Sequence, residues 1–322
     1  MDQYPTRQVG FWTTATVSRH LYDSEMRLPF VRSAPGYAAK SRVVQLATGR
    51  KVGVYEYGDP NGRPVFALHG TPACGAGFNW TDGPARARGI RVIAPDRPGI
   101  GHSDPVPMAS VSEYPPELGA LADALEIDRF AVIGYSGGGP YALAVAHRFA
   151  ERVLAVEIVS GAGEIGAWAT WKDLARSDRQ LTWLSLHTPA VARAVFRIAD
   201  IGARTAPRTA LRSAATEMSA RDREVLASLG SPSEALALFT QALAHSSDGV
   251  VTDYALLARP WRVPLGEISV PVHCWHGTHD TLVPLALSEA LTARLPDAEL
   301  TTWPGEGHLA LIPHIAEVLD DI

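Results

Sequence analysis

A serine between glycines follows an apolar stretch near the middle of the chain. Residues 130–133 are a short apolar run that leads directly into GYSGG (134–138), and a helical apolar pattern follows. The pattern G-x-S-x-G between a strand and a helix is typical of a tight turn that exposes a nucleophilic serine. The free N–H groups of the following helix would face whatever Ser136 attacks. We therefore predict that Ser136 is a nucleophile. The alternative is a Gly-rich turn with an incidental serine.

A serine hydroxyl needs a base, and a histidine near the C-terminus is suited to that role. His308 ends the segment PGEGH (304–308), which follows the strand-like residues 299–303. A loop at the end of a parallel strand lies at the carboxyl edge of the sheet, where the serine turn is also expected. We predict that His308 is the general base. The alternative is a histidine that caps the last helix.

The base in turn needs an acid that fixes its tautomer. Asp280 lies in the segment WHGTHD (275–280), in the loop after another apolar run. We predict that its carboxylate accepts the Nδ1–H of His308. Two alternatives remain: Asp280 caps the helix near Leu282, or the acid is Glu157 or Glu164 at the end of the preceding strand.

Acyl transfer also requires two N–H donors for a developing oxyanion. Gly137, next to the nucleophile, is one expected donor. The other is expected in the segment HGTP (69–72), which follows the apolar run 65–68. Because Pro72 has no N–H, Thr71 is the predicted second donor, with some help from its hydroxyl. A structural turn without a catalytic role is the alternative.

Short apolar runs and helical patterns must position these residues. Residues 42–46 and 51–57 predict an antiparallel hairpin. Beyond it, strand-length apolar runs alternate with helical patterns, which predicts a mostly parallel sheet covered by helices on both faces. The expected strands are 65–68, 90–94, 130–133, 153–159 and 270–275, and the expected helices are 118–125, 141–149, 285–295 and 312–319.

The alternation stops near Gly161 and resumes near Val270. The segment between is rich in Ala, Arg and Leu, has helical character and contains three tryptophans. We predict an inserted helical cap above the carboxyl edge of the sheet. Candidate substrate-binding residues are Tyr135 and the cap tryptophans, although helical core packing explains the tryptophans equally well; the three are Trp168, Trp171 and Trp183.

Four segments divide the chain in this interpretation. Residues 1–40 form an arm of unknown role, 41–161 the first part of the core, 162–265 the cap insertion and 266–322 the second part of the core.

Together these motifs resemble the α/β-hydrolase family, and the likeness runs from about Arg42 to the C-terminus. DRPGIGHSD (96–104) is similar to the D-R-x-G-x-G-x-S turn of the family, and GTHD (277–280) and GEGH (305–308) are similar to its acid and histidine loops. The chain order serine, aspartate, histidine is also that of the family. The resemblance implies an α/β-hydrolase fold with Ser136, Asp280 and His308 as its catalytic triad.

The chain also departs from parts of the family. Serine at the nucleophile position does not favour haloalkane dehalogenases or epoxide hydrolases, and H-G-T-P at 69–72 differs from the H-G-G-G of some lipases and esterases. No family template matches residues 1–40. The fold hosts many reactions, so the resemblance implies no particular substrate.

Composition excludes several other function classes. The 322 residues carry a net charge of −5, which gives no electrostatic footprint for nucleic acid or an anionic membrane, and no apolar run is long enough to span a bilayer. Cys74 and Cys274 are expected to be reduced thiols. His273, His276 and His279 crowd one segment near Asp280, but a strand sends the first two to opposite faces, which disfavours a metal site. We expect a cytoplasmic protein.

These observations predict a serine hydrolase for a small-molecule substrate, with no cofactor. The expected reaction is hydrolysis of a carboxylic ester, lactone or similar acyl compound of a small apolar substrate through an acyl-enzyme. One alternative is a C–C bond hydrolase or an acyltransferase with the same triad. Another is a ligand-binding module that uses the capped pocket without turnover.

Overall fold

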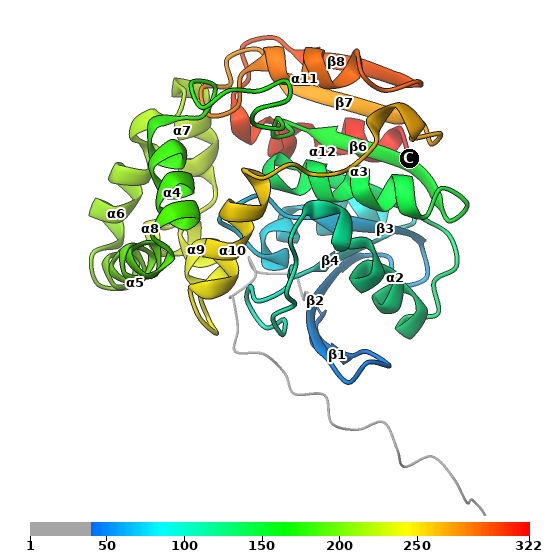
Figure 1. Ribbon diagram of the computed structural model, residues 1–322, viewed down its shortest axis with the longest axis horizontal. Helices are drawn as coiled ribbons and strands as arrows, with labels where there is room; N and C mark the ends of the chain where they lie inside the picture. The colour runs from blue at the N-terminus through cyan, green and yellow to red at the C-terminus, as the bar shows by residue number, and fades with distance from the viewer. Residues whose placement is uncertain (1–39) are drawn as a thin grey trace, which may run out of the picture.

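A computed structural model describes residues 40–322, and within this range an eight-stranded sheet forms the centre of the fold (Figure 1). The arm predicted for residues 1–40 lies outside the described residues apart from Lys40, which begins the first strand. The strands follow the order β1-β2-β4-β3-β5-β6-β7-β8. Their bounds are β1 (Lys40–Gln45), β2 (Lys51–Gly58), β3 (Arg63–Leu68), β4 (Ile90–Pro95), β5 (Phe130–Tyr135), β6 (Val153–Val159), β7 (Val272–Gly277) and β8 (Ala298–Trp303).

The pairing is antiparallel only at the start of the sheet. β1 and β2 form the predicted hairpin, β2 pairs with β4 antiparallel, and all remaining pairs are parallel. Strands β3, β5, β6 and β7 therefore end at one common edge. The predicted fold class, a mostly parallel α/β-hydrolase sheet flanked by helices, is confirmed.

Two hydrophobic layers hold the sheet between helices. Alternate residues of β3 enter different layers: Phe66 and Leu68 pack on one face, and Val65 and Ala67 on the other. This period of two is what an extended strand imposes when both faces are covered. The helices α2, α3 and α11 pack on the first face, and α1 and α12 on the second; their bounds are α1 (Asp82–Ala87), α2 (Pro115–Ala124), α3 (Gly139–Arg148), α11 (Leu285–Thr292) and α12 (Leu311–Asp320).

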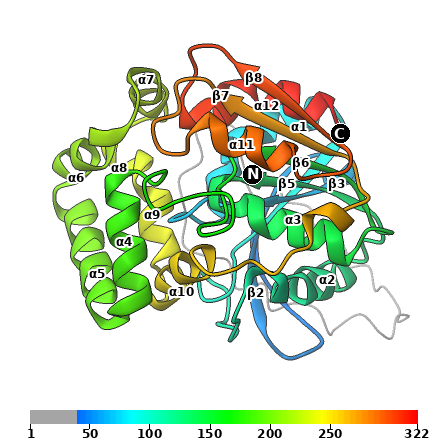
Figure 2. The same ribbon diagram turned by 45° about the horizontal axis from the view of Figure 1, so that its top comes forward.

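A group of helices occupies the stretch between β6 and β7. They lie together at one side of the sheet in both views (Figures 1 and 2). We call this group the cap; the limits of 162–265 that the sequence analysis gave it stay a prediction. Its helices are α4 (Arg176–His187), α5 (Pro189–Thr205), α6 (Pro207–Ala214), α7 (Ala220–Ser228), α8 (Pro232–Ala235), α9 (Ala237–Ala242) and α10 (Asp248–Leu257).

The described helices and the two cysteines agree with the sequence analysis. Among residues 40–322, no helix combines the length and the apolar character needed to cross a bilayer. Cys74 and Cys274 are buried and unpaired, as predicted.

The close approach of Gly138 to the end of β3 allows the packing beside the serine turn to be tested. A Cβ atom on Gly138 would lie 2.1 Å from the carbonyl oxygen of Leu68, whereas a Cβ on Gly202 in α5 would meet nothing within 4 Å. We expect Gly138→Ala to lower the free energy of unfolding by about 1–3 kcal/mol, because rigid backbone must move. Gly202→Ala should leave it unchanged or raise it by up to about 1 kcal/mol, because alanine favours helix. Urea denaturation measures both, and equal effects would contradict the proposed crowding at Gly138.

Candidate active site

Ser136 lies at a sharp turn between strand and helix. β5 ends at Tyr135, a 3₁₀ turn covers Ser136–Gly138, and α3 begins at Gly139. Ser136 has a φ of 52°, in the left-handed region that costs energy for a residue with a side chain. The turn is tight on its inner side, since a Cβ on Gly134 would lie 2.8 Å from the Cα of Gly139. The glycines of the motif therefore allow the conformation that exposes the serine.

The structure brings the three predicted residues of the triad together. His308 begins a 3₁₀ turn, and its Nε2 lies 3.0 Å from Ser136 Oγ. On the other side of the ring, Nδ1 lies 2.8 Å from Oδ2 of Asp280, whose side chain is fully buried. With Nδ1 protonated, Nε2 is free to accept the serine proton.

Asp280 is held by more than the histidine. Its Oδ1 accepts the N–H groups of Leu282 and Val283, each at 2.9 Å, and His276 Nε2 lies 3.3 Å from Oδ2. Burial raises the pKa of Asp280, but the charge of His308 and the hydrogen bonds from His276 and His308 outweigh it and hold this pKa well below its usual range. One oxygen therefore holds the turn that precedes α11, and the other binds the histidine. Asp280 does not cap a helix near Leu282, because α11 begins at Leu285 with Pro284 as its N-cap.

The alternative acids are engaged elsewhere. Glu157 accepts the indole N–H of Trp275 at 2.6 Å, and Glu164 accepts the backbone N–H of Trp261 at 2.8 Å. Neither carboxylate is hydrogen bonded to His308.

Carboxylates dominate the surroundings of His308. Burial lowers the pKa of the imidazole, but the charges of Asp280, Asp222 and Asp178 raise it, and the net result lies above its ordinary value. Asp222 and Asp178 come from cap helices α7 and α4. These carboxylates would stabilise an imidazolium at His308.

The loop after β3 lies directly against the serine turn. A Cβ on Gly70 would be 3.2 Å from the Cβ of Ser136, and a Cβ on Gly137 would be 2.6 Å from Thr71 Oγ1. The Thr71 hydroxyl donates to Asp253 and accepts from Arg97 at 2.9 Å. Its only hydrogen is therefore already used, so the hydroxyl cannot assist an oxyanion as the sequence analysis suggested. Among residues 40–322, no acceptor engages the backbone N–H of Thr71.

A buried ion pair fixes this loop to the cap. Arg97 and Asp253 of α10 form two hydrogen bonds, of 3.0 and 2.6 Å, and their side chains are only 1% and 4% exposed. The Tyr141 hydroxyl also donates to Asp253 at 2.7 Å. Arg97 further donates to the carbonyl oxygens of His69 and Gly70. Arg97, the cation of the D-R-x-G motif, therefore links the loop after β3 to α10, and Asp253 neutralises its charge.

The predicted substrate-binding residues lie in different surroundings. The Tyr135 hydroxyl donates to the carbonyl of His308 at 3.0 Å, so this ring supports the histidine loop. Trp168 packs edge-on against Trp261, Trp171 is half-buried, and Trp183 is 50% exposed beside His187. That these residues bind substrate stays a prediction.

The histidines at positions 273, 276 and 279 do not gather into one ligand cluster within the described range. His273 bonds to Asp321 and Thr301, whereas His276 bonds to Ser288 and to the Val283 carbonyl on the other face of β7. The side chains of Glu157, His273 and Asp321 approach within 4.8 Å of one another. Their polar atoms, however, already pair with one another, with Thr301 and with Trp275.

Sequence patterns did not point to three residues around the site. Asp178 and Asp253 lie in the cap segment in no recognisable motif, whereas Asp222 ends SARD (219–222), a pattern typical of a helix N-terminus that does not indicate a contact with the histidine. Only the packing of the cap helices brings Asp253 to the loop after β3 and the other two to the histidine.

Comparison with known proteins gives a family and several related enzymes. Residues 63–315 match the family model described as "alpha/beta hydrolase fold". Over 263 residues the chain is 29% identical to 2-hydroxy-6-oxo-6-phenylhexa-2,4-dienoate hydrolase of Burkholderia cepacia, covering 79% of this chain and 84% of that protein. Over 122 residues it is 37% identical to 2-hydroxy-6-oxo-2,4-heptadienoate hydrolase of Pseudomonas putida, but this covers only 37% of the chain and 44% of that enzyme.

Solved structures agree on the fold. An esterase from Exiguobacterium antarcticum superposes with a TM-score of 0.64 over 87% of this chain and 96% of that one, at 18% sequence identity. At this identity the likeness concerns the fold alone.

The contribution of the buried Arg97–Asp253 pair to stability can be tested by mutation. Asp253→Ala leaves a buried cation without its partner, so we expect a loss of about 3–5 kcal/mol in the free energy of unfolding. As a control, Asp200→Ala removes the surface pair with Arg204, whose side chain is 55% exposed. That change should cost less than about 1 kcal/mol. Urea denaturation of both variants measures the difference, and equal losses would contradict a structural role for the buried pair.

Proposed function

The chain belongs to the α/β-hydrolase fold family, and from this premise we propose that it is a serine hydrolase. The proposed reaction is hydrolysis of a carboxylic ester, lactone or similar acyl compound of a small apolar substrate through an acyl-enzyme. The observation that carries the proposal is the continuous hydrogen-bond chain from Ser136 through His308 to Asp280, with distances of 3.0 and 2.8 Å. This geometry is what nucleophilic catalysis by a serine requires.

The first half of the reaction forms the acyl-enzyme. Ser136 Oγ attacks the carbonyl carbon while its proton passes to Nε2 of His308. The backbone N–H groups of Gly137 and Thr71 donate to the oxygen that becomes negative, in a preorganised site where such bonds stabilise the transition state strongly. The imidazolium then gives its proton to the leaving alcohol, and the acyl group stays on Ser136.

The second half releases the acid. His308 takes a proton from water, which attacks the acyl carbon, and the same proton returns to Ser136 Oγ as the ester bond breaks. Asp280 stays ionised throughout because its pKa lies well below the usual range. The mechanism requires no metal or organic cofactor. A small-molecule substrate and a cytoplasmic location complete the proposal.

A C–C bond hydrolase is the second candidate, because two related enzymes are named for dienoate substrates. Such a substrate carries a carboxylate. The charged groups that act on His308 are themselves carboxylates, those of Asp280, Asp222 and Asp178. Arg97, the buried cation nearest the oxyanion loop, is neutralised by Asp253. This charge distribution favours a neutral acyl substrate over an anionic one, so we rank ester hydrolysis first.

Covalent labelling tests the nucleophile. We expect one fluorophosphonate adduct on the folded wild type, because an activated Ser136 attacks phosphorus, and none on Ser136→Ala. Intact mass spectrometry measures the adduct, and heat-denatured wild type is the control for labelling that does not depend on the site. Absence of an adduct on folded wild type would contradict the proposed hydrolase and favour a binding module.

Substrate charge tests the ranking of ester over C–C cleavage. We expect kcat/KM for p-nitrophenyl butyrate to exceed that for p-nitrophenyl hemisuccinate by about tenfold or more, because the second ester carries a carboxylate into an acidic site; tenfold corresponds to about 1.4 kcal/mol. Asp178→Asn should narrow the ratio by removing one repelling charge.

A parallel assay with a 2-hydroxy-6-oxo-dienoate decides between the candidates. Faster cleavage of this compound than of the neutral ester would overturn the ranking.

A further inference from the structure

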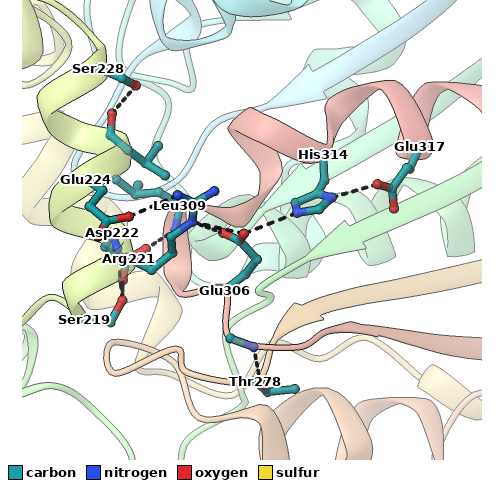
Figure 3. A network of polar contacts seen from close by, with 12 residues as sticks. Ser219, Arg221, Asp222, Glu224, Ser228, Thr278, Glu306, Leu309, His314 and Glu317 are labelled. Atoms are coloured by element: carbon teal, nitrogen blue, oxygen red, sulfur yellow. Dashed lines mark hydrogen bonds and ion pairs between the residues drawn. The ribbon is translucent and has the colours of Figure 1, made fainter.

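A carboxylate of the cap reaches the loop that carries the candidate catalytic histidine. Asp222 lies in the first turn of α7 and is 1% exposed. Its Oδ1 accepts the backbone N–H of Leu309 at 2.7 Å, and its Oδ2 accepts the hydroxyl of Ser219 at 2.8 Å (Figure 3). Both oxygens are therefore held, one by the cap and one by the residue that follows His308.

The same carboxylate also packs on the residue that precedes the histidine. A Cβ on Gly307 would lie 2.3–2.4 Å from the carboxylate atoms of Asp222. A residue with a side chain at position 307 would push the carboxylate away. Asp222 thus contacts the chain immediately before and immediately after His308.

A second contact fixes the opposite side of the histidine backbone. The Tyr135 hydroxyl, from the strand that carries the nucleophile, donates to the His308 carbonyl at 3.0 Å. Tyr135 of the core thus holds the His308 carbonyl, and Asp222 of the cap holds the Leu309 N–H. These two bonds leave the peptide between His308 and Leu309 little freedom to rotate, and its orientation sets where the imidazole points.

We propose that Asp222 is a positioning residue for His308, through which the cap fixes the imidazole between Ser136 and Asp280. The proposal rests on the proposed function, since it assigns Asp222 a role in the same reaction. It makes the cap part of the catalytic arrangement as well as a cover for the substrate. An arrangement of the cap that withdraws α7 would leave the peptide between His308 and Leu309 with only the hydrogen bond from Tyr135.

The charge of Asp222 also acts on His308. Groups that face His308 are Asp280 from the loop after β7, Asp222 from α7, Asp178 from α4 and the Tyr135 hydroxyl from β5. The three carboxylates raise the histidine pKa against the effect of burial. Neutralising Asp222 should therefore lower this pKa and move the onset of activity, which needs neutral His308, to lower pH.

A neighbouring ion pair supplies a matched control. Arg221, also in α7, binds Glu306 of the same loop with two hydrogen bonds of 3.0 Å, as Figure 3 shows. The Arg221 side chain is 41% exposed, so this pair contributes little. Arg221→Ala removes a contact between the cap and the histidine loop without touching Gly307 or Leu309.

The experiment measures the rate constant of fluorophosphonate labelling against pH. The rate constant should rise with pH as His308 loses its proton, so each variant gives a plateau at high pH and a midpoint pH. Asp222→Asn keeps an oxygen acceptor for the Leu309 N–H but loses the charge. We therefore expect its plateau rate constant to lie within about threefold of wild type and its midpoint to lie at lower pH. Asp222→Ala loses both, so its plateau should fall by about tenfold or more. Arg221→Ala should match wild type in plateau and midpoint. Circular dichroism and thermal melting verify that each variant is folded.

Several results would overturn the proposal. An unchanged midpoint in Asp222→Asn, or a wild-type plateau in Asp222→Ala, would assign Asp222 to stability of the cap alone. An equal loss in Arg221→Ala would assign the effect to any contact between cap and loop. If Asp222→Ala does not fold, the midpoint of Asp222→Asn decides. A wild type that does not label contradicts the proposed function itself, which distinguishes the two failures.

Discussion

The turn after β5 is the constraint on which the rest of the site depends. The chain must pass from a buried strand to a buried helix within three residues, and it does so with Ser136 at a φ of 52°. Such a conformation persists only where the surroundings over-determine it. Here the close approaches at Gly134 and Gly138 join the turn to α3 and to the end of β3. The same contacts bring the loop after β3 beside the serine, so the candidate nucleophile and one candidate oxyanion donor are positioned together.

The second feature is an uneven distribution of charge around that turn. On the side of the histidine, three carboxylates raise the pKa of His308. On the side of the loop after β3, the charge of the buried Arg97 is neutralised by Asp253. Negative potential is therefore placed where an imidazolium would form, while the loop after β3 is held by a neutral ion pair. A neutral ester suits such a site better than an anion, because desolvated like charges repel strongly in a medium of low dielectric constant.

The cap takes part in both halves of this arrangement. Through Asp253 of α10 it holds the loop with the candidate oxyanion donor, and through Asp222 of α7 it holds the loop with the histidine. Each contact is made by a buried carboxylate, and each acts on a loop that follows a strand of the sheet. The insertion between β6 and β7 is thus joined to the core at the points where the proposed chemistry occurs.

Local patterns in the sequence determined the strand-turn-helix around Ser136, the alternation of strands and helices, and the candidates His308 and Asp280. Those signals are short-range: a period of two in strands, a period of 3.6 in helices, and glycines where the backbone has no room. Once a parallel sheet is inferred, its common edge brings together a histidine and a serine that are 172 positions apart. The tertiary structure alone decided the partners of individual polar groups. In that structure the Thr71 hydroxyl donates to Asp253, Trp183 is half exposed, and Asp222 accepts the backbone N–H of Leu309 in the histidine loop. A hydrogen bond depends on the positions of two side chains to within tenths of an ångström, and the packing of the cap helices sets those positions.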